Sequence, residues 1–165
     1  MRDKRSTLGI IGALACLSSA MFATNATAQT AAPPHERAAG QVLTMPATVP
    51  SALPAKSAAA EPPTAWPKPA DIQHVSTPGG FSCAGGNLCT SVYDPTKGDY
   101  VVYSFYYCDT YTLSNWSGAG GYRNAQTGGA TAHFYGKTGN ELKSVPVGGS
   151  SSSYNWSPVY SIRNC

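Results

Sequence analysis

The chain has 165 residues, a formal net charge of +3 at pH 7 and only 12% charged residues. Residues 81–165 hold five lysines or arginines against four acidic residues, so this part of the chain is close to neutral. A near-neutral region without a basic stripe excludes the charge pattern of a nucleic-acid-binding protein.

Residues 1–28 have the three parts of a secretory signal peptide. The charged stretch MRDKR precedes the apolar run LGIIGALACLSSAMF, and ATA at Ala26–Ala28 fits a cleavage site before Gln29. The apolar run is too short and too rich in small residues to predict a membrane span. ALAC at Cys16 matches a lipoprotein box only in part, because Ala13 stands where leucine is preferred, so we expect no lipid anchor. Secretion from a bacterial cell is predicted, and exported proteins can keep disulfides.

Residues 29–80 are rich in alanine, proline and threonine. The first 80 residues hold ten of the thirteen prolines and no tyrosine. This composition disfavours a packed core and favours extended, mobile chain. We expect either a spacer that holds the domain away from the cell or a pro-segment that is removed after export. One folded domain is predicted at residues 81–165, which contain all ten tyrosines and four of the five cysteines.

Two β-hairpins are predicted after residue 80. The first joins NLCTSVY to YVVYSFYYC through the turn DPTKGD, and the second joins ATAHFY to NELKSV through GKTG. Within YVVYSFYYC two sets of apolar and aromatic residues alternate, which is typical of a strand. No stretch of a dozen residues has helical periodicity, so the predicted fold class is all-β.

The stretch NWSGAGGYRN at Asn115–Asn124 recurs as NWSPVYSIRN at Asn155–Asn164, with five identities in ten positions. Each copy follows one of the two hairpins. We therefore interpret the domain as a duplication, with motifs at about 81–124 and 125–165 that must pack on each other to bury their apolar faces.

The tryptophans of the two copies are the predicted centre of the core. We expect Trp116 and Trp156 to occupy equivalent, largely buried positions related by a pseudo-twofold axis. Tyr122 and Ile162 are the matched core residues of the strands that follow them.

These features resemble a known family. Two tandem units, each opening with an aromatic-flanked hairpin that bears a turn glycine, are similar to a βγ-crystallin domain, in which two Greek-key motifs form a two-sheet sandwich. CAGGNLCTSVY at Cys83–Tyr93 is similar to the opening of secreted bacterial metalloproteinase inhibitors of this fold, and SPVYSIRNC resembles the closing strand of a βγ motif. The resemblance covers residues 81–165, and the same fold hosts proteins of several functions.

The sequence departs from the calcium-binding members of that family. In the windows WSGAGG (Trp116–Gly121) and WSPVYS (Trp156–Ser161), Trp-Ser stands where those members carry a pair of Asn or Asp residues. Calcium prefers several hard oxygen ligands. We expect no strong calcium site, with a weak site of carbonyl groups as the alternative, and no other metal or cofactor.

Candidate catalytic residues are few. Residues 81–165 contain one histidine, His133, in the alternating segment ATAHFY, and a lone histidine on a strand does not predict a zinc site or a catalytic base. A Ser-His-Asp set could be drawn with His133 and Asp109, but no nucleophile-elbow sequence supports it. We therefore expect a protein that is not an enzyme.

Four cysteines after the signal peptide allow three pairings. The short spacing of Cys83 and Cys89 can close a small loop around AGGNL, which leaves Cys108 to pair with Cys165. The rival pairing, Cys83 with Cys108 and Cys89 with Cys165, is also reasonable for neighbouring strands, so both stay open.

The resemblance implies a secreted binding protein that inhibits a peptidase, in particular a metalloprotease. The alternatives are a secreted antimicrobial or killer-toxin-like protein of the same fold and a cell-surface structural module. We expect a monomer whose partner is a secreted protease or a component of the cell envelope. The candidate binding residues are turn residues and tyrosines: Asp94, Lys97, Tyr106, Tyr107, Tyr111 and Lys137.

Overall fold

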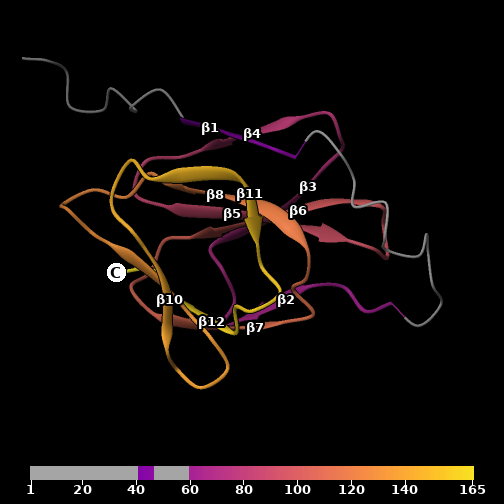
Figure 1. Cartoon of the computed structure of the whole chain (residues 1–165). Coiled ribbons are helices and arrows are strands. Elements are labelled where there is room, and N and C mark those ends of the chain that lie inside the picture. The colour runs from indigo at the N-terminus through magenta and orange to yellow at the C-terminus, as the bar shows by residue number, and fades with distance from the viewer. Residues whose placement is uncertain (1–40, 47–59) are drawn as a thin grey trace, which may run out of the picture. The chain divides into compact units, whose positions relative to one another are not determined.

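The computed structural model describes residues 41–46 and 60–165, which form strands, turns and loops without a helix (Figure 1). The predicted all-β class is therefore confirmed. In this part of the chain there is accordingly no helix long and apolar enough to cross a membrane. The predicted signal peptide at 1–28, Cys16 included, lies outside the described residues, as do residues 29–40 and 47–59 of the predicted spacer.

The described strands form two five-stranded antiparallel sheets and one two-stranded ribbon. The first sheet has the order β11 (Ser150–Asn155), β8 (Ala119–Asn124), β5 (Leu88–Asp94), β6 (Asp99–Phe105) and β3 (Asp71–Val75). The second has the order β10 (Glu141–Val145), β9 (Ala132–Tyr135), β12 (Ser161–Arg163), β7 (Thr110–Ser114) and β2 (Thr64–Trp66). The ribbon consists of β1 (Gln41–Thr44) and β4 (Gly80–Cys83).

The first predicted repeat contains β5 to β8 and the second contains β9 to β12. The third strand of each repeat lies in the sheet that holds the other three strands of the other repeat. The hairpin β5–β6 and strand β8 belong to the first repeat and share one sheet, but its third strand, β7, lies in the second sheet beside β12. In the same way, the hairpin β9–β10 and strand β12 share the second sheet, whereas β11 lies in the first sheet beside β8. Neither repeat can complete a sheet by itself, because each sheet takes strands from both.

The asparagines that end the two copies make matched contacts. Asn124 and Asn164 are both fully buried. Asn124 Nδ2 donates to the carbonyl oxygen of Val145 at the end of β10 (2.8 Å), and Asn164 Nδ2 donates to that of Phe105 at the end of β6 (3.1 Å). Each asparagine thus joins the fourth strand of its own repeat to the second strand of the other, as a duplication requires.

The predicted burial of the two tryptophans is confirmed. Trp116 is 5% exposed and Trp156 is fully buried, and their rings meet edge to face with centroids 5.1 Å apart. Tyr122 and Ile162, on β8 and β12, also lie in the core between the two sheets, as expected.

The hydrogen-bond partners of the two indoles differ. Trp156 Nε1 donates to the carbonyl oxygen of Ser91 in β5, whereas Trp116 Nε1 donates to that of Thr64 in β2, each at 2.9 Å. The difference arises because β2 comes from the chain before the duplicated part, so its carbonyl has no counterpart in the second repeat. The two positions therefore match in burial but not in their polar contacts.

Gly120 in β8 lies directly beneath the indole of Trp156. A Cβ at this position would lie 2.0 Å from the Ser91 carbonyl oxygen and 2.6 Å from Trp156 Nε1. Such distances are impossible for a real side chain, so the bond between Trp156 and Ser91 requires glycine here.

The folded part begins well before residue 81. β2 and β3 lie in the predicted spacer, yet they form the outer strands beside β7 and β6. Proline lacks the N–H that a central strand needs, but it is tolerated at the edge of a sheet and next to short strands. The proline-rich composition therefore excludes a central strand but does not exclude the edge strands that these residues form.

Strand β6 is buried on both faces. Its inward set enters the core between the sheets, as the alternation predicts: Val101, Tyr103 and Phe105. Its outward residues Tyr100 and Val102 are buried as well, in a second apolar cluster with Leu43 and Met45. This second cluster explains why both alternating sets of β6 are apolar.

The disulfides are Cys83–Cys89 and Cys108–Cys165, which decides between the two pairings that the sequence leaves open. The second bridge joins residues 57 positions apart. On the chain-entropy account, closing a loop of this length stabilises the fold by about 4 kcal/mol.

We predict that Gly120→Ala lowers the free energy of unfolding by about 3 kcal/mol, because the added methyl group overpacks the core and displaces the indole hydrogen bond. The measurement is urea unfolding of the chain with intact disulfides. Gly85→Ala is the matched control, since a Cβ there meets no atom within 4 Å. Equal midpoints for the two variants would contradict the role given to Gly120.

Candidate functional site

The structure separates the six predicted binding residues. Tyr106 and Tyr107 lie together in a surface groove, Asp94 and Lys97 belong to the β5–β6 turn, and Lys137 belongs to the β9–β10 turn. The sixth residue, Tyr111, lies in the core and is described next.

Tyr111 is not a surface residue, so its prediction as a binding residue is wrong. It is 1% exposed, and its ring packs against Phe105 with centroids 4.5 Å apart. Its hydroxyl donates to the carbonyl oxygen of Tyr107 at 3.0 Å. Tyr111 lies six positions after Phe105, an even number, so it falls in the same alternating set as the inward residues of β6.

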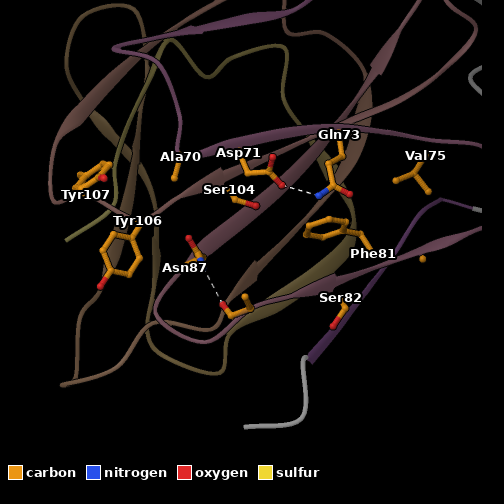
Figure 2. A pocket seen from close by; sticks show the side chains of 12 residues that line it. Ala70, Asp71, Gln73, Val75, Phe81, Ser82, Asn87, Ser104, Tyr106 and Tyr107 are labelled. Atoms are coloured by element: carbon orange, nitrogen blue, oxygen red, sulfur yellow. Dashed lines mark hydrogen bonds between the residues drawn. The ribbon is translucent and has the colours of Figure 1, made fainter. Parts of the chain in front are cut away.

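Tyr106 and Tyr107 flank a groove of about 690 Å³, here called the tyrosine groove. Tyr106 is 57% exposed and Tyr107 is 65% exposed, and their rings meet edge to face with centroids 5.5 Å apart. Figure 2 shows the two rings on one side of the groove, with Gln73 and Phe81 on the other. Besides the tyrosines, the polar side chains that line it are Asp71, Gln73, Ser82, Asn87 and Ser104.

Hydrogen bonds hold two polar side chains of the tyrosine groove in place. Gln73 Nε2 donates to Asp71 Oδ2 at 2.6 Å, and Asn87 Nδ2 donates to the carbonyl oxygen of Ala84 at 3.1 Å. Exposed rings beside fixed amide and carboxylate groups suit a ligand with both hydroxyl groups and an apolar face, such as a saccharide or a polar peptide.

The β5–β6 turn is fixed by Asp94, which is only 2% exposed. Asp94 Oδ1 accepts hydrogen bonds from the backbone N–H of Thr96 (2.8 Å) and from its hydroxyl (2.7 Å). The Asp94 carbonyl oxygen accepts two more, from the N–H groups of Lys97 and Gly98. Gly98 has a φ of 76°, which glycine adopts without strain. Lys97 is therefore an exposed side chain on a rigid turn.

A second groove, of about 560 Å³ and here called the apolar groove, lies next to this turn. Trp66 and Ile72 line it and are 74% and 43% exposed. Tyr103 also lines it and donates from its hydroxyl to the carbonyl oxygen of Pro63. The sequence did not indicate this groove, because Trp66 and Ile72 fall in the predicted spacer.

His74 brings a possible metal-ligand set to the apolar groove. Its Nδ1 lies 2.8 Å from Asp99 Oδ1. The ligand atoms of His74, Asp94 and Asp99 all lie within 4.8 Å of one another. The sequence predicts no metal ligand here, because His74 precedes the predicted domain at residues 81–165, whose one histidine is His133.

The β9–β10 turn is also ordered by hydrogen bonds. Gly136 N–H donates to the Asn140 carbonyl oxygen, and the Thr138 hydroxyl donates to Asn140 Oδ1, each at 2.8 Å. Lys137 Nζ lies 6.0 Å from the centroid of the Tyr160 ring. In this turn no buried carboxylate anchors the backbone, in contrast to Asp94 in the first hairpin.

Comparisons with protein-family models, with curated proteins and with solved structures give no match for this chain.

Ionisation of Tyr103 should link stability to alkaline pH. Burial, and secondly the nearby charge of Asp94, raise the pKa of Tyr103 above the ordinary value of 10. Because the folded state then holds its proton more tightly than the unfolded chain, the stabilisation is complete below about pH 10 and is lost as the pH rises above that value.

We predict that above about pH 10 the free energy of unfolding of Tyr103→Phe falls less steeply with pH than that of the wild type. The measurement is the free energy of unfolding at a series of pH values from neutral to strongly alkaline. Burial raises the pKa of other tyrosines too, so some loss remains in the variant: Tyr100, Tyr111, Tyr122 and Tyr154. Identical slopes for the two proteins would exclude a contribution from Tyr103.

Proposed function

We propose that the chain is a secreted, non-enzymatic binding protein that presents its β5–β6 turn to a peptidase as an inhibitor. The observation that carries the proposal is the anchoring of this turn by the buried Asp94 carboxylate and carbonyl, which leaves Lys97 exposed at the tip. A loop that is already ordered loses little conformational entropy on binding, and this is the main requirement for an inhibitor that carries no catalytic group.

The proposal includes a βγ-crystallin-like fold of two Greek-key motifs. Two observations support it: the reciprocal exchange of β7 and β11, and the matched contacts of Asn124 and Asn164. The resemblance to bacterial metalloproteinase inhibitors favours a metallopeptidase as the target. The cationic Lys97 at the tip favours a peptidase whose binding cleft is acidic.

Hydrogen bonds also explain how such a turn would resist cleavage. A peptidase binds its substrate in an extended conformation, so the turn would have to open before cleavage. Opening the turn would break both hydrogen bonds from Thr96 to Asp94 Oδ1. It would also leave the Asp94 carboxylate buried without its partners, which costs free energy. The turn should therefore bind without being cut.

We predict that the chain inhibits at least one member of a panel of secreted metallo- and serine peptidases at stoichiometric concentration. Lys97→Ala should weaken inhibition roughly tenfold or more, as expected for the central side chain of an interface. Lys137→Ala is the matched control, because it removes the same charge from the other hairpin turn. The protein should include residues 34–80, because β1, β2 and β3 belong to the fold.

No inhibition of either peptidase class at stoichiometric excess would refute the inhibitor proposal. Equal effects of Lys97→Ala and Lys137→Ala would show that net charge, and not the anchored turn, carries the interaction.

The tyrosine groove favours a second candidate function, binding of a cell-envelope glycan. Its two exposed rings offer apolar faces for a sugar, and Asp71, Gln73 and Asn87 offer hydrogen-bonding groups beside them. This function needs neither the β5–β6 turn nor Lys97, so the two candidates can be tested separately.

We predict that the double variant Tyr106→Ala/Tyr107→Ala binds a cell-wall polysaccharide roughly tenfold more weakly than the wild type. The measurement is co-sedimentation with insoluble cell-wall material. Tyr160→Ala serves as the control, since Tyr160 is 45% exposed and does not line the groove. Unchanged binding by the double variant would exclude the groove.

A further inference from the structure

The geometry points to a binding site for a divalent transition-metal ion of the Zn²⁺ type, formed by His74, Asp94 and Asp99 beside the apolar groove. The ligand atoms of the three side chains lie within 4.8 Å of one another. This site shares Asp94 with the proposed inhibitory turn, but none of its three ligands lines the tyrosine groove, and it can be tested without a peptidase or a glycan.

Strand register explains why these three side chains meet. Asp94 and Asp99 are direct partners where β5 pairs with β6. His74 of β3 is paired with Val101, two residues beyond Asp99 on the same face of β6. Side chains alternate between the faces of a sheet, so residues from three adjacent strands point to one side at this end of the sheet.

Charge and burial favour a cation at this place. Asp94 is 2% exposed, and both hydrogen bonds found for its side chain fall on Oδ1. Among the described residues its carboxylate forms no ion pair with a lysine or arginine, although Lys97 lines the same groove. Asp99 brings a second carboxylate close to it. A divalent ion would relieve the repulsion of two neighbouring carboxylates, one of them removed from water.

The donor set selects the type of ion. Calcium and magnesium prefer oxygen ligands, whereas one imidazole nitrogen with two carboxylate oxygens suits zinc and its neighbours. Zinc lies about 2.0–2.2 Å from nitrogen and oxygen ligands, so its ligand atoms are separated by roughly 3.4 Å. His74 Nδ1 and Asp99 Oδ1 are 2.8 Å apart, and their side chains are 32% and 22% exposed, which leaves them room to adjust.

The apolar groove gives access to the site. His74 and Asp94 both line this space of about 560 Å³. Three protein ligands leave a fourth position of a tetrahedral ion open, as in zinc sites that bind water or a further ligand. The open position here would face the groove beside Trp66 and Ile72.

The second hairpin provides an internal comparison. His133 Nδ1 lies 3.0 Å from Glu141 Oε2, a contact much like that of His74 with Asp99. Within the described residues no second carboxylate joins this pair in a metal-ligand group. If a histidine–carboxylate contact alone were enough to bind metal, both hairpins would bind, whereas the proposal places the ion only at His74.

The test uses the full untagged chain with intact disulfides, freed of metal by a chelator and dialysed. Calorimetric titration with Zn²⁺ should show one saturable site. Co²⁺ should give visible absorption bands of a four-coordinate ion. His74→Ala and Asp99→Asn should each weaken binding about 100-fold. The double variant His35→Ala/His133→Ala, which keeps His74 as its only histidine, should bind as the wild type does.

A thermal measurement provides a second readout. Zn²⁺ that binds only the folded state should raise the midpoint of thermal unfolding of the wild type and of the double variant, but not of His74→Ala. Absence of saturable binding up to about 1 mM metal would overturn the proposal. So would equal affinity of His74→Ala and the wild type. Because no peptidase or glycan is present, failure here leaves the proposed function unaffected, and the reverse also holds.

Discussion

The hydrogen bond from the Trp156 indole to the Ser91 carbonyl crosses from the second repeat to the first, over a position where only glycine fits. The indole also contacts the rings of Trp116, Tyr122, Phe134 and Tyr154, so it fixes residues of both sheets at once. A buried indole N–H without an acceptor would destabilise the fold by more than the hydrogen bond stabilises it. The fold therefore depends on the register of β5, β8 and β11, which keeps the Ser91 carbonyl beneath the indole. The turn anchored by Asp94 continues directly from β5, one of these strands.

Exchange of β7 and β11 makes the two repeats interdependent, but the two repeats carry different surface features. The first carries the turn anchored by Asp94, and it gains β2 and β3 from the preceding chain. Those added strands supply Trp66, Ile72 and His74, so the apolar groove exists only on that side. The second repeat keeps a histidine–carboxylate pair at His133 but lacks the second carboxylate. Two halves with the same strand plan thus carry distinct surfaces, because the added strands lie beside only one of them.

Much of the fold could be predicted because its signals are local. Alternating residues identify both hairpins, and the repeated NWS stretch identifies the buried tryptophans. The edge strands could not be predicted, since β2 and β3 are short and their pairing depends on partners 25 to 50 residues away. The apolar groove and its metal-ligand set could not be predicted for the same reason, because Trp66 lies on β2 and His74 on β3. Tyr111 could have been predicted as a core residue, because it belongs to the same alternating set as Phe105, whereas Tyr107 of that set is exposed after β6 ends.

The carbonyl of Phe105 at the end of the first hairpin receives its hydrogen bond from Asn164, 59 residues later in the chain. During synthesis, therefore, the first repeat cannot satisfy all of its own buried polar groups until the second has emerged. Contacts between such distant residues slow folding, and they make it cooperative across both repeats. A chain that ends before residue 164 should therefore be open to proteases, whereas the finished chain should resist them.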